Sequence, residues 1–211
     1  MSAVLRFRRE DDGSVELDLP EEERLALDGL LGELLELLGA GVAATEPGPS
    51  APSHPSPTER PDPADRPDPS DPAALAALVG IGSSSEPPTD PVSARLFPAA
   101  YADAAAAGDF RRYTEQRLRD RKIAGASAAR ATWAEGAGPW RLDAQAQQVW
   151  LGALNDLRLA LGTLLEIDED DDPQERMAQA VGEDGDGGYW LYVWLTDLQA
   201  DLLAALTAPP G

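Results

Sequence analysis

The sequence has no cysteine and only one histidine among its 211 residues. Without cysteine, the chain forms no disulfide, offers no thiolate ligand or nucleophile, and has no thiol of its own that an oxidant could switch. The single histidine, His54, lies among prolines and cannot build a two-histidine metal site. We therefore expect no catalytic residues, no metal and no cofactor, and the protein is not expected to be an enzyme.

Positive charge is scarce: 17 Lys and Arg residues stand against 38 Asp and Glu residues, a net charge of −21. Such a charge repels phosphate groups, so any contact with nucleic acid is expected to be indirect unless a local basic face outweighs it. The sequence also has no apolar signal core at its start and no uncharged apolar run of the roughly 18 residues that span a membrane. The expectation is a cytoplasmic protein without membrane contact.

The first nineteen residues alternate apolar and charged side chains, as a β-hairpin does. A three-residue turn that ends at Gly13 places Phe7 opposite Leu17 and Arg8 opposite Glu16. This register gives one apolar face and one ion-paired face, and it puts glycine where the turn needs a left-handed residue. A two-residue turn would mix the two faces.

A proline-rich segment divides the chain. A helix is predicted from Pro20, with acidic residues in its first turn, and its end is predicted at Gly39 and Gly41. Ten of the nineteen prolines follow within the next thirty residues or so, with almost nothing apolar to bury. We predict a hairpin and first helix over 1–39, a disordered insertion over 40–71, and the helical remainder of the same domain over 72–207.

The remainder is expected to be helical, since Asp-Pro pairs and single aspartates precede its apolar runs. On the helix after Asp143, an apolar stripe from Trp150 to Leu165 and a second face indicate burial on two sides. The predicted fold class is mainly α, a helical bundle with a small N-terminal β-hairpin and a disordered Pro-rich insertion. Helices are expected over 71–80, from 90 past 97, over 103–133 with a break near Asp120, and over 143–165, 172–181 and 189–206.

Basic residues concentrate in one stretch, from Arg111 to Lys122. It is either a patch for an acidic protein surface or nucleic acid, or an ion-paired helix face that answers the acidic remainder. On the first interpretation, the residues that contact a partner are Arg111, Arg112, Arg119 and Lys122.

Other polar positions favour structural roles. Asn155, Asp156 and Arg158 are interpreted as a polar network that ties helices together, with Asp156 pointing more outward. Two acidic runs, 166–172 and 183–188, lack the spacing of a calcium loop and are interpreted as solvated loops. The tryptophans are expected to belong to the core.

Several strings, in the same order along the chain, carry a resemblance to a known family. They are Arg95-Leu96-Phe97-Pro98, Ala100-Tyr101, the run from Phe110 to Glu115 with Leu118-Arg119, the run from Leu154 to Gly162, and Trp194-Leu195-Thr196. Together they resemble the actinobacterial AosR family of oxidative-stress transcriptional regulators, formerly described as a domain of unknown function. The likeness covers residues 3–39 and 73–206 and omits the proline-rich insertion.

The resemblance implies a mainly helical, non-enzymatic regulator of the transcriptional stress response, which contacts a sigma factor or RNA polymerase. Direct sensing of an oxidant by a thiol needs cysteine, which this chain lacks. Of the implied role, we therefore retain only the regulatory part as an expectation. Three alternatives stay open: an adaptor in Clp-dependent proteolysis, a direct DNA binder, and a metal-dependent enzyme on the acidic loops. A homodimer is a possible assembly.

Overall fold

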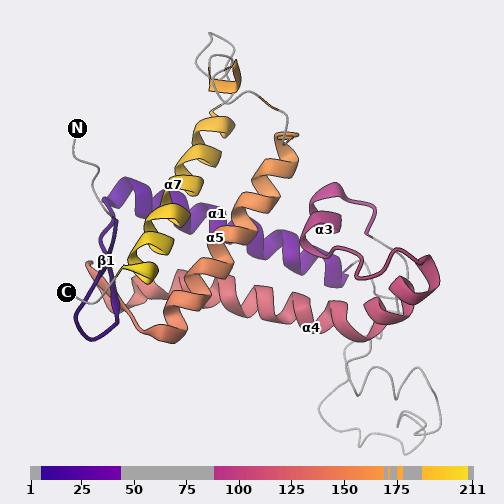
Figure 1. The fold of residues 1–211 in the computed structure, drawn as a ribbon, viewed down its shortest axis with the longest axis horizontal. Coiled ribbons are helices and arrows are strands. Elements are labelled where there is room, and N and C mark those ends of the chain that lie inside the picture. The colour runs from indigo at the N-terminus through magenta and orange to yellow at the C-terminus, as the bar shows by residue number, and fades with distance from the viewer. Residues whose placement is uncertain (1–5, 44–87, 169–170, 172–174, 178–186, 209–211) are drawn as a thin grey trace, which may run out of the picture.

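The computed structural model describes residues 6–43, 88–168, 171, 175–177 and 187–208. A small sheet lies at one end of a set of helices (Figure 1), which confirms the predicted helical fold with its N-terminal hairpin. Within these ranges, no helix combines the length and the apolar character that crossing a membrane requires. In chain order the elements are β1 (Phe7–Arg9), β2 (Val15–Leu17), α1 (Glu21–Ala43), α3 (Pro91–Leu96), α4 (Ala104–Ala131), the 3₁₀ helix η2 (Thr132–Glu135), β3 (Trp140–Leu142), α5 (Ala144–Leu164) and α7 (Gly188–Thr207).

Three of the predicted segments fall largely beyond what the structure describes. The proline-rich insertion and the helix predicted over 71–80 lie outside the described residues, apart from 40–43. The same holds for most of the helix predicted over 172–181. The division of the chain into segments 1–39, 40–71 and 72–207 stays a prediction.

The hairpin has the register that the sequence predicts, with Phe7 opposite Leu17 and Arg8 opposite Glu16. Gly13 adopts a φ of +85°, a left-handed conformation in which other residues are strained, and its N–H donates to the Glu10 carbonyl at 3.0 Å. The ion-paired face forms as expected, since the Arg8 guanidinium lies 2.5 Å from the Glu16 carboxylate.

A third strand, β3, extends the hairpin into an antiparallel sheet of order β1-β2-β3. It pairs with β2, so that Leu142 lies opposite Val15 and Trp140 opposite Leu17. The sequence did not predict this strand, because Trp140–Leu142 has no turn and second strand next to it in the chain, as the two strands of the hairpin have. One face of the sheet is buried against the helices through Phe7, Val15, Leu17, Trp140 and Leu142.

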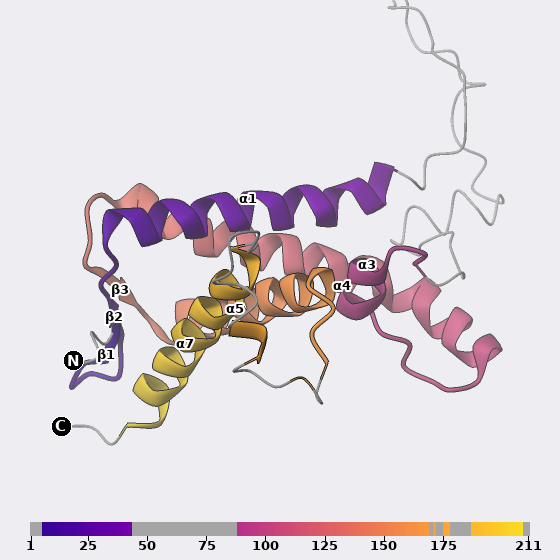
Figure 2. The ribbon, with the colours of Figure 1, turned by 90° about the horizontal axis from the view of Figure 1, so that it is seen from above.

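The helices form two crossed layers behind this sheet. Figure 2 shows α1 and α4 running side by side along the length of the molecule, and Figure 1 shows α5 and α7 crossing them. The core lies where the layers meet and includes Trp150, Leu154, Leu195, Leu198 and Leu202. Trp133 contacts both Trp140 and Trp150 edge to face, so these tryptophans belong to the core as expected, whereas Trp190 is exposed.

Aspartate caps fix where three helices begin. The carboxylates of Asp90, Asp103 and Asp143 accept the N–H three residues on, at 2.7 to 2.8 Å, as the sequence predicts. For Asp90, this backbone hydrogen bond lowers the pKa of the carboxyl group. The predicted break near Asp120 is wrong, because Asp120 stays in α4 and accepts a hydrogen bond from Gln116 one turn earlier.

The predicted end of the first helix is also wrong, since α1 continues through Gly39 and Gly41 to Ala43. A glycine inside a helix costs about 1 kcal/mol, which does not by itself end the helix. Here the last turns have tertiary support: Leu38 is fully buried, and its carbonyl accepts a hydrogen bond from Arg119 of α4 at 2.9 Å.

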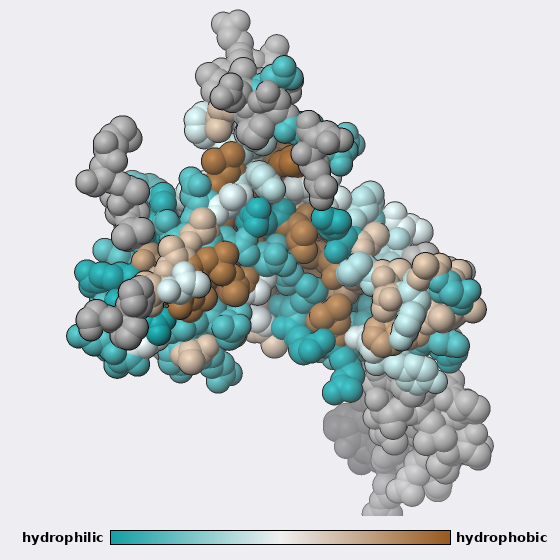
Figure 3. Space-filling view, viewed as in Figure 1, coloured by the Kyte–Doolittle hydropathy of each residue, from teal (hydrophilic) through white to brown (hydrophobic). Residues whose placement is uncertain are grey.

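The carboxyl end of α5 projects from the bundle beside α7. Leu164 is 66% exposed there, although the predicted apolar stripe includes it. Figure 3 shows apolar residues at the upper parts of α5 and α7, and further apolar patches lower on the same face among polar residues. The chain then reverses in a capping turn in which the N–H of Ile167 donates to the Gly162 carbonyl at 2.9 Å.

Glu166 occupies the position in this turn that usually holds glycine, with a φ of +50°. We expect Glu166→Gly to raise the free energy of unfolding by about 1 kcal/mol. A side chain costs roughly 1–2 kcal/mol in the left-handed region, and the greater conformational entropy of glycine in the unfolded chain offsets part of the stability gained by removing it. Urea denaturation of the two proteins measures the difference. Glu36→Gly, in the regular part of α1, is the control and is expected to destabilise; a loss of stability in both variants would contradict the assignment.

Candidate interaction surface

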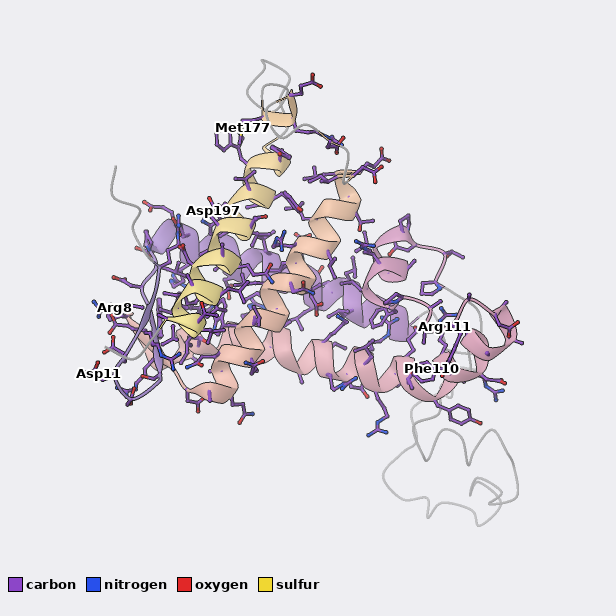
Figure 4. All side chains as sticks on the ribbon, viewed as in Figure 1. Arg8, Asp11, Phe110, Arg111, Met177 and Asp197 are labelled. Carbon is purple, nitrogen blue, oxygen red and sulfur yellow. The ribbon has the colours of Figure 1, made fainter. Side chains whose placement is uncertain are left out.

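The amino-terminal half of α4 extends beyond the bundle at the end far from the sheet, where α3 lies beside it (Figure 2). The basic stretch predicted to bind a partner begins on this part of the helix, at Arg111, and continues past its middle to Lys122. Figure 4 labels Phe110 and Arg111 there.

Two of the predicted contact residues, Arg111 and Arg119, form ion pairs inside the protein. Arg111 is 9% exposed and Arg119 is 6% exposed. Their guanidinium groups lie on either side of the Glu115 carboxylate, each at 3.1 Å, one helical turn away. The ion-paired interpretation of the basic stretch therefore describes both arginines.

Arg119 also joins three helices. Besides Glu115, its guanidinium donates to the carbonyl of Leu38 at the end of α1. It lies over the ring of Phe97, which follows α3, with 4.3 Å from the guanidinium carbon to the ring centroid. These contacts place the side chain between α1, α3 and α4, where it holds elements together.

Lys122 is held in a second ion pair, between α4 and α5. Its ammonium nitrogen lies 2.6 Å from the Asp156 carboxylate. The expectation that Asp156 points outward is wrong, because α4 covers this side of α5 and leaves Asp156 only 7% exposed. Desolvating a carboxylate is costly, and the lysine compensates for it.

The structure places the three residues of the predicted polar network in separate surroundings. Asp156 binds Lys122, whereas Arg158 reaches α7 and donates to Thr196 Oγ1 at 3.0 Å and to the Gln199 side chain. Asn155 is exposed, and no hydrogen bond between described residues joins it to the other two. Two interhelical links thus replace the single predicted network.

The outward side of α4 carries a different set of residues, which we call the α4 outer face: Phe110, Tyr113, Arg117 and Arg121. Positions three, seven and eleven residues beyond Phe110 fall near one line along a helix. Phe110 is 43% exposed and Tyr113 is 55% exposed. Tyr101 packs edge to face on Phe110, with 5.6 Å between ring centroids, and is itself exposed.

The arginines of the α4 outer face are exposed and form no ion pair with another described residue. Arg112, the one exposed member of the predicted contact set, lies five residues before Arg117 and therefore about 140° from it around the helix. A small hollow of about 200 Å³ adjoins the face and is lined by Phe97, Pro98, Phe110 and Arg121.

Charge alone did not reveal this face. The predicted contact residues share only their closeness along the chain. The signal that joins aromatic and basic residues on one side of α4 is a helical spacing, that of Phe110, Tyr113, Arg117 and Arg121. That spacing was available in the sequence. Which side of α4 the bundle covers is a tertiary property, and it decides which arginines reach solvent.

Part of the acidic run after α5 lies within the described residues, and there the Asp171 carboxylate accepts hydrogen bonds from two groups. The Asp168 N–H and the Arg176 guanidinium, the latter at 2.8 Å, donate to it and lower the pKa of Asp171, and the Asp168 N–H has the larger effect. Among the residues that the structure describes, no three His, Cys, Asp or Glu side chains gather closely enough to hold a metal ion.

Residues 1–206 match a family described as "Domain of unknown function (DUF2017)". The chain belongs to the DUF2017 family. A relative from Mycobacterium leprae (strain TN), named "Putative oxidative stress regulator AosR", is 33% identical to this DUF2017 member over 149 residues, which cover 64% of the chain and 67% of the relative. The resemblance to the AosR family is confirmed by this match. No solved structure matches the chain.

Proposed function

We propose that this DUF2017 member is a non-enzymatic regulator of the transcriptional response to oxidative stress, and that it acts by binding a sigma factor or RNA polymerase. The name of the Mycobacterium leprae relative supports the regulatory part. The observation that carries the protein-binding part is the α4 outer face, where two exposed aromatic rings and two arginines without an ion-pair partner among the described residues share one side of a helix.

Such a face has the composition of a protein-binding site. Interfaces are enriched in tyrosine, phenylalanine and arginine, and a few such residues supply most of the binding energy. Phe110 and Tyr113 offer area that leaves water on binding, and Arg117 and Arg121 offer forked donors for carboxylates. The expected partner surface is therefore acidic with an apolar centre.

Direct binding measurements test this proposal. Purified full-length chain is titrated against purified core RNA polymerase and against sigma factors from the same organism. We expect one of them to bind, and we expect Phe110→Ala and the double change Arg117→Glu and Arg121→Glu each to weaken binding about tenfold or more, since hot-spot residues contribute about 2 kcal/mol or more.

Arg112→Glu is the control, because it makes the same kind of charge reversal at one position on another side of the same helix. It is expected to leave binding nearly unchanged, whereas equal weakening would favour the contact set predicted from the sequence. Binding to neither protein, or tighter salt-dependent binding to duplex DNA, would contradict the proposal. The thermal unfolding of every variant is measured to show that each is folded.

A further inference from the structure

A cleft of about 570 Å³ opens between α3, α7 and the carboxyl-terminal part of α5, away from the α4 outer face. Sites for small molecules have volumes of roughly 300 to 1,000 Å³. The cleft is lined by charged groups of both signs, together with an aromatic ring and apolar side chains. The residues that matter for its chemistry are Arg95, Arg158, Glu166, Asp168, Ile167 and Tyr192.

Arg158 lines the cleft with a guanidinium group that forms no ion pair with a carboxylate of the described residues. Its guanidinium is half-buried and fixed by neutral partners, the Thr196 hydroxyl and the Gln199 amide oxygen. It also lies 5.6 Å from the ring centroid of Tyr192. No described carboxylate lies within ion-pair distance, although the chain has 38 acidic residues. A preorganised guanidinium of this kind is suited to a carboxylate from outside.

Arg95 supplies a second guanidinium to the same cleft. It lies in the last turn of α3, is exposed, and forms no ion pair with a described residue. Two cations that line one cleft repel each other, so an anionic group between them would be favourable. The basic part of the cleft is thus suited to an anionic group such as a carboxylate.

The carboxyl end of α5 supplies the opposite charge. Glu166 and Asp168 line the cleft, and neither side chain forms an ion pair with a described residue, because Arg176 binds the Glu166 carbonyl and the Asp171 carboxylate instead. Glu166 holds its place at a positive φ that glycine would adopt more readily. Backbone strain of this kind is often retained at binding sites.

The spacing of the charges sets the size of the ligand. Arg158 lies six residues before the end of α5 at Leu164, a rise of about 9 Å along the helix, and Glu166 lies in the turn just beyond that end. The two residues therefore line the cleft over a span of about 9 Å or more. An extended peptide of two or three residues, at about 3.3–3.6 Å per residue, fits it better than a free amino acid.

We propose that this cleft binds a short zwitterionic peptide, with the peptide carboxylate at Arg95 and Arg158 and the peptide ammonium group at Glu166 and Asp168. Ile167, Leu159 and the Tyr192 ring provide apolar contact for a central side chain. Neither the α4 outer face nor a protein partner is needed for this binding, so the cleft and the proposed function can fail separately.

Isothermal titration calorimetry of the full chain tests the proposal, with the tripeptide Ala-Leu-Ala as probe. We expect one site per chain, and we expect the N-acetylated and the C-amidated peptides each to bind about tenfold or more weakly, because each loses a charged hydrogen-bonding group. Free leucine is the size control. Absence of binding by Ala-Leu-Ala, equal binding by the blocked peptides, or tighter binding by leucine would each overturn the proposal.

Two single variants locate the site. Arg95→Gln and Glu166→Gln are each expected to weaken Ala-Leu-Ala about tenfold or more, and to weaken the peptide lacking the corresponding terminal charge much less. Neither side chain forms an ion pair with a described residue, so both variants are expected to fold, as thermal unfolding will show. Arg112→Gln, which removes the same charge outside the cleft, is the control. An equal effect of Arg112→Gln would show only a general field effect and would overturn the assignment.

Discussion

Replacing Glu115 by alanine is expected to lower the free energy of unfolding by about 3 kcal/mol. The Glu115 carboxylate lies 3.1 Å from the guanidinium groups of both Arg111 and Arg119, which are themselves almost completely buried. Removing it leaves two guanidinium groups close together with no charge between them, and breaking a buried ion pair from one side costs about 3–5 kcal/mol. The lower end of that range applies because Glu115 is itself partly exposed.

Urea denaturation of the variant and the parent chain measures this loss. Glu115→Gln keeps a hydrogen-bond acceptor without the charge, and its free energy of unfolding is expected to lie between those of Glu115→Ala and the parent chain. Glu36→Ala, an exposed glutamate on α1, is the matched control and is expected to change stability by no more than about 0.5 kcal/mol. A loss for Glu115→Ala no larger than that of the control would mean that the two arginines are not held as the structure places them.

The second large effect is expected for Asp156→Ala, at about 3 kcal/mol. The variant leaves the Lys122 ammonium group between α4 and α5 without the carboxylate that lies 2.6 Å from it. Unlike the Glu115 cluster, this pair offers a rescue, because Asp156→Leu combined with Lys122→Met removes both charges and retains apolar volume. Replacing both partners of a buried pair by hydrophobic residues is often neutral or stabilising.

Thermal and urea denaturation of the parent chain, Asp156→Leu, Lys122→Met and the double variant form a double-mutant cycle that isolates the interaction. Asp197→Ala, an exposed aspartate on α7, controls for the loss of one negative charge from a chain of net charge −21. If the double variant is as unstable as Asp156→Ala alone, the cost arises from lost packing and not from an unpaired lysine.

Local signals in the sequence predicted much of the fold. Aspartate caps placed the starts of α3, α4 and α5, and the alternation around Gly13 gave the hairpin register, because both depend on residues only a few positions apart. Tertiary support decided what was missed. Gly39 did not end α1 because Leu38 is buried and Arg119 binds its carbonyl, and β3 exists because β2 offers it an edge.

The candidate surface was only half accessible to sequence reasoning. The basic stretch was visible, but Arg111, Arg119 and Lys122 face the bundle, and a count of charges does not distinguish an inward arginine from an outward one. Glu115 and Asp156, which form ion pairs with these basic residues, are acidic residues that no sequence pattern distinguishes from the others. The chemistry of the Arg158 cleft depends on residues from three helices that no local spacing relates.

The sheet order has a consequence for how variable this protein can be in length. Strand β2 precedes residues 44–87 and strand β3 follows them, yet the two strands pair, and α1 and α4 lie side by side. Contacts between described residues on either side of 44–87 therefore hold the two parts of the chain together. Each doubling of a connecting loop costs only about 0.6 kcal/mol in closure entropy. Insertions or deletions between α1 and α3 can accordingly accumulate among related proteins without disturbing the core.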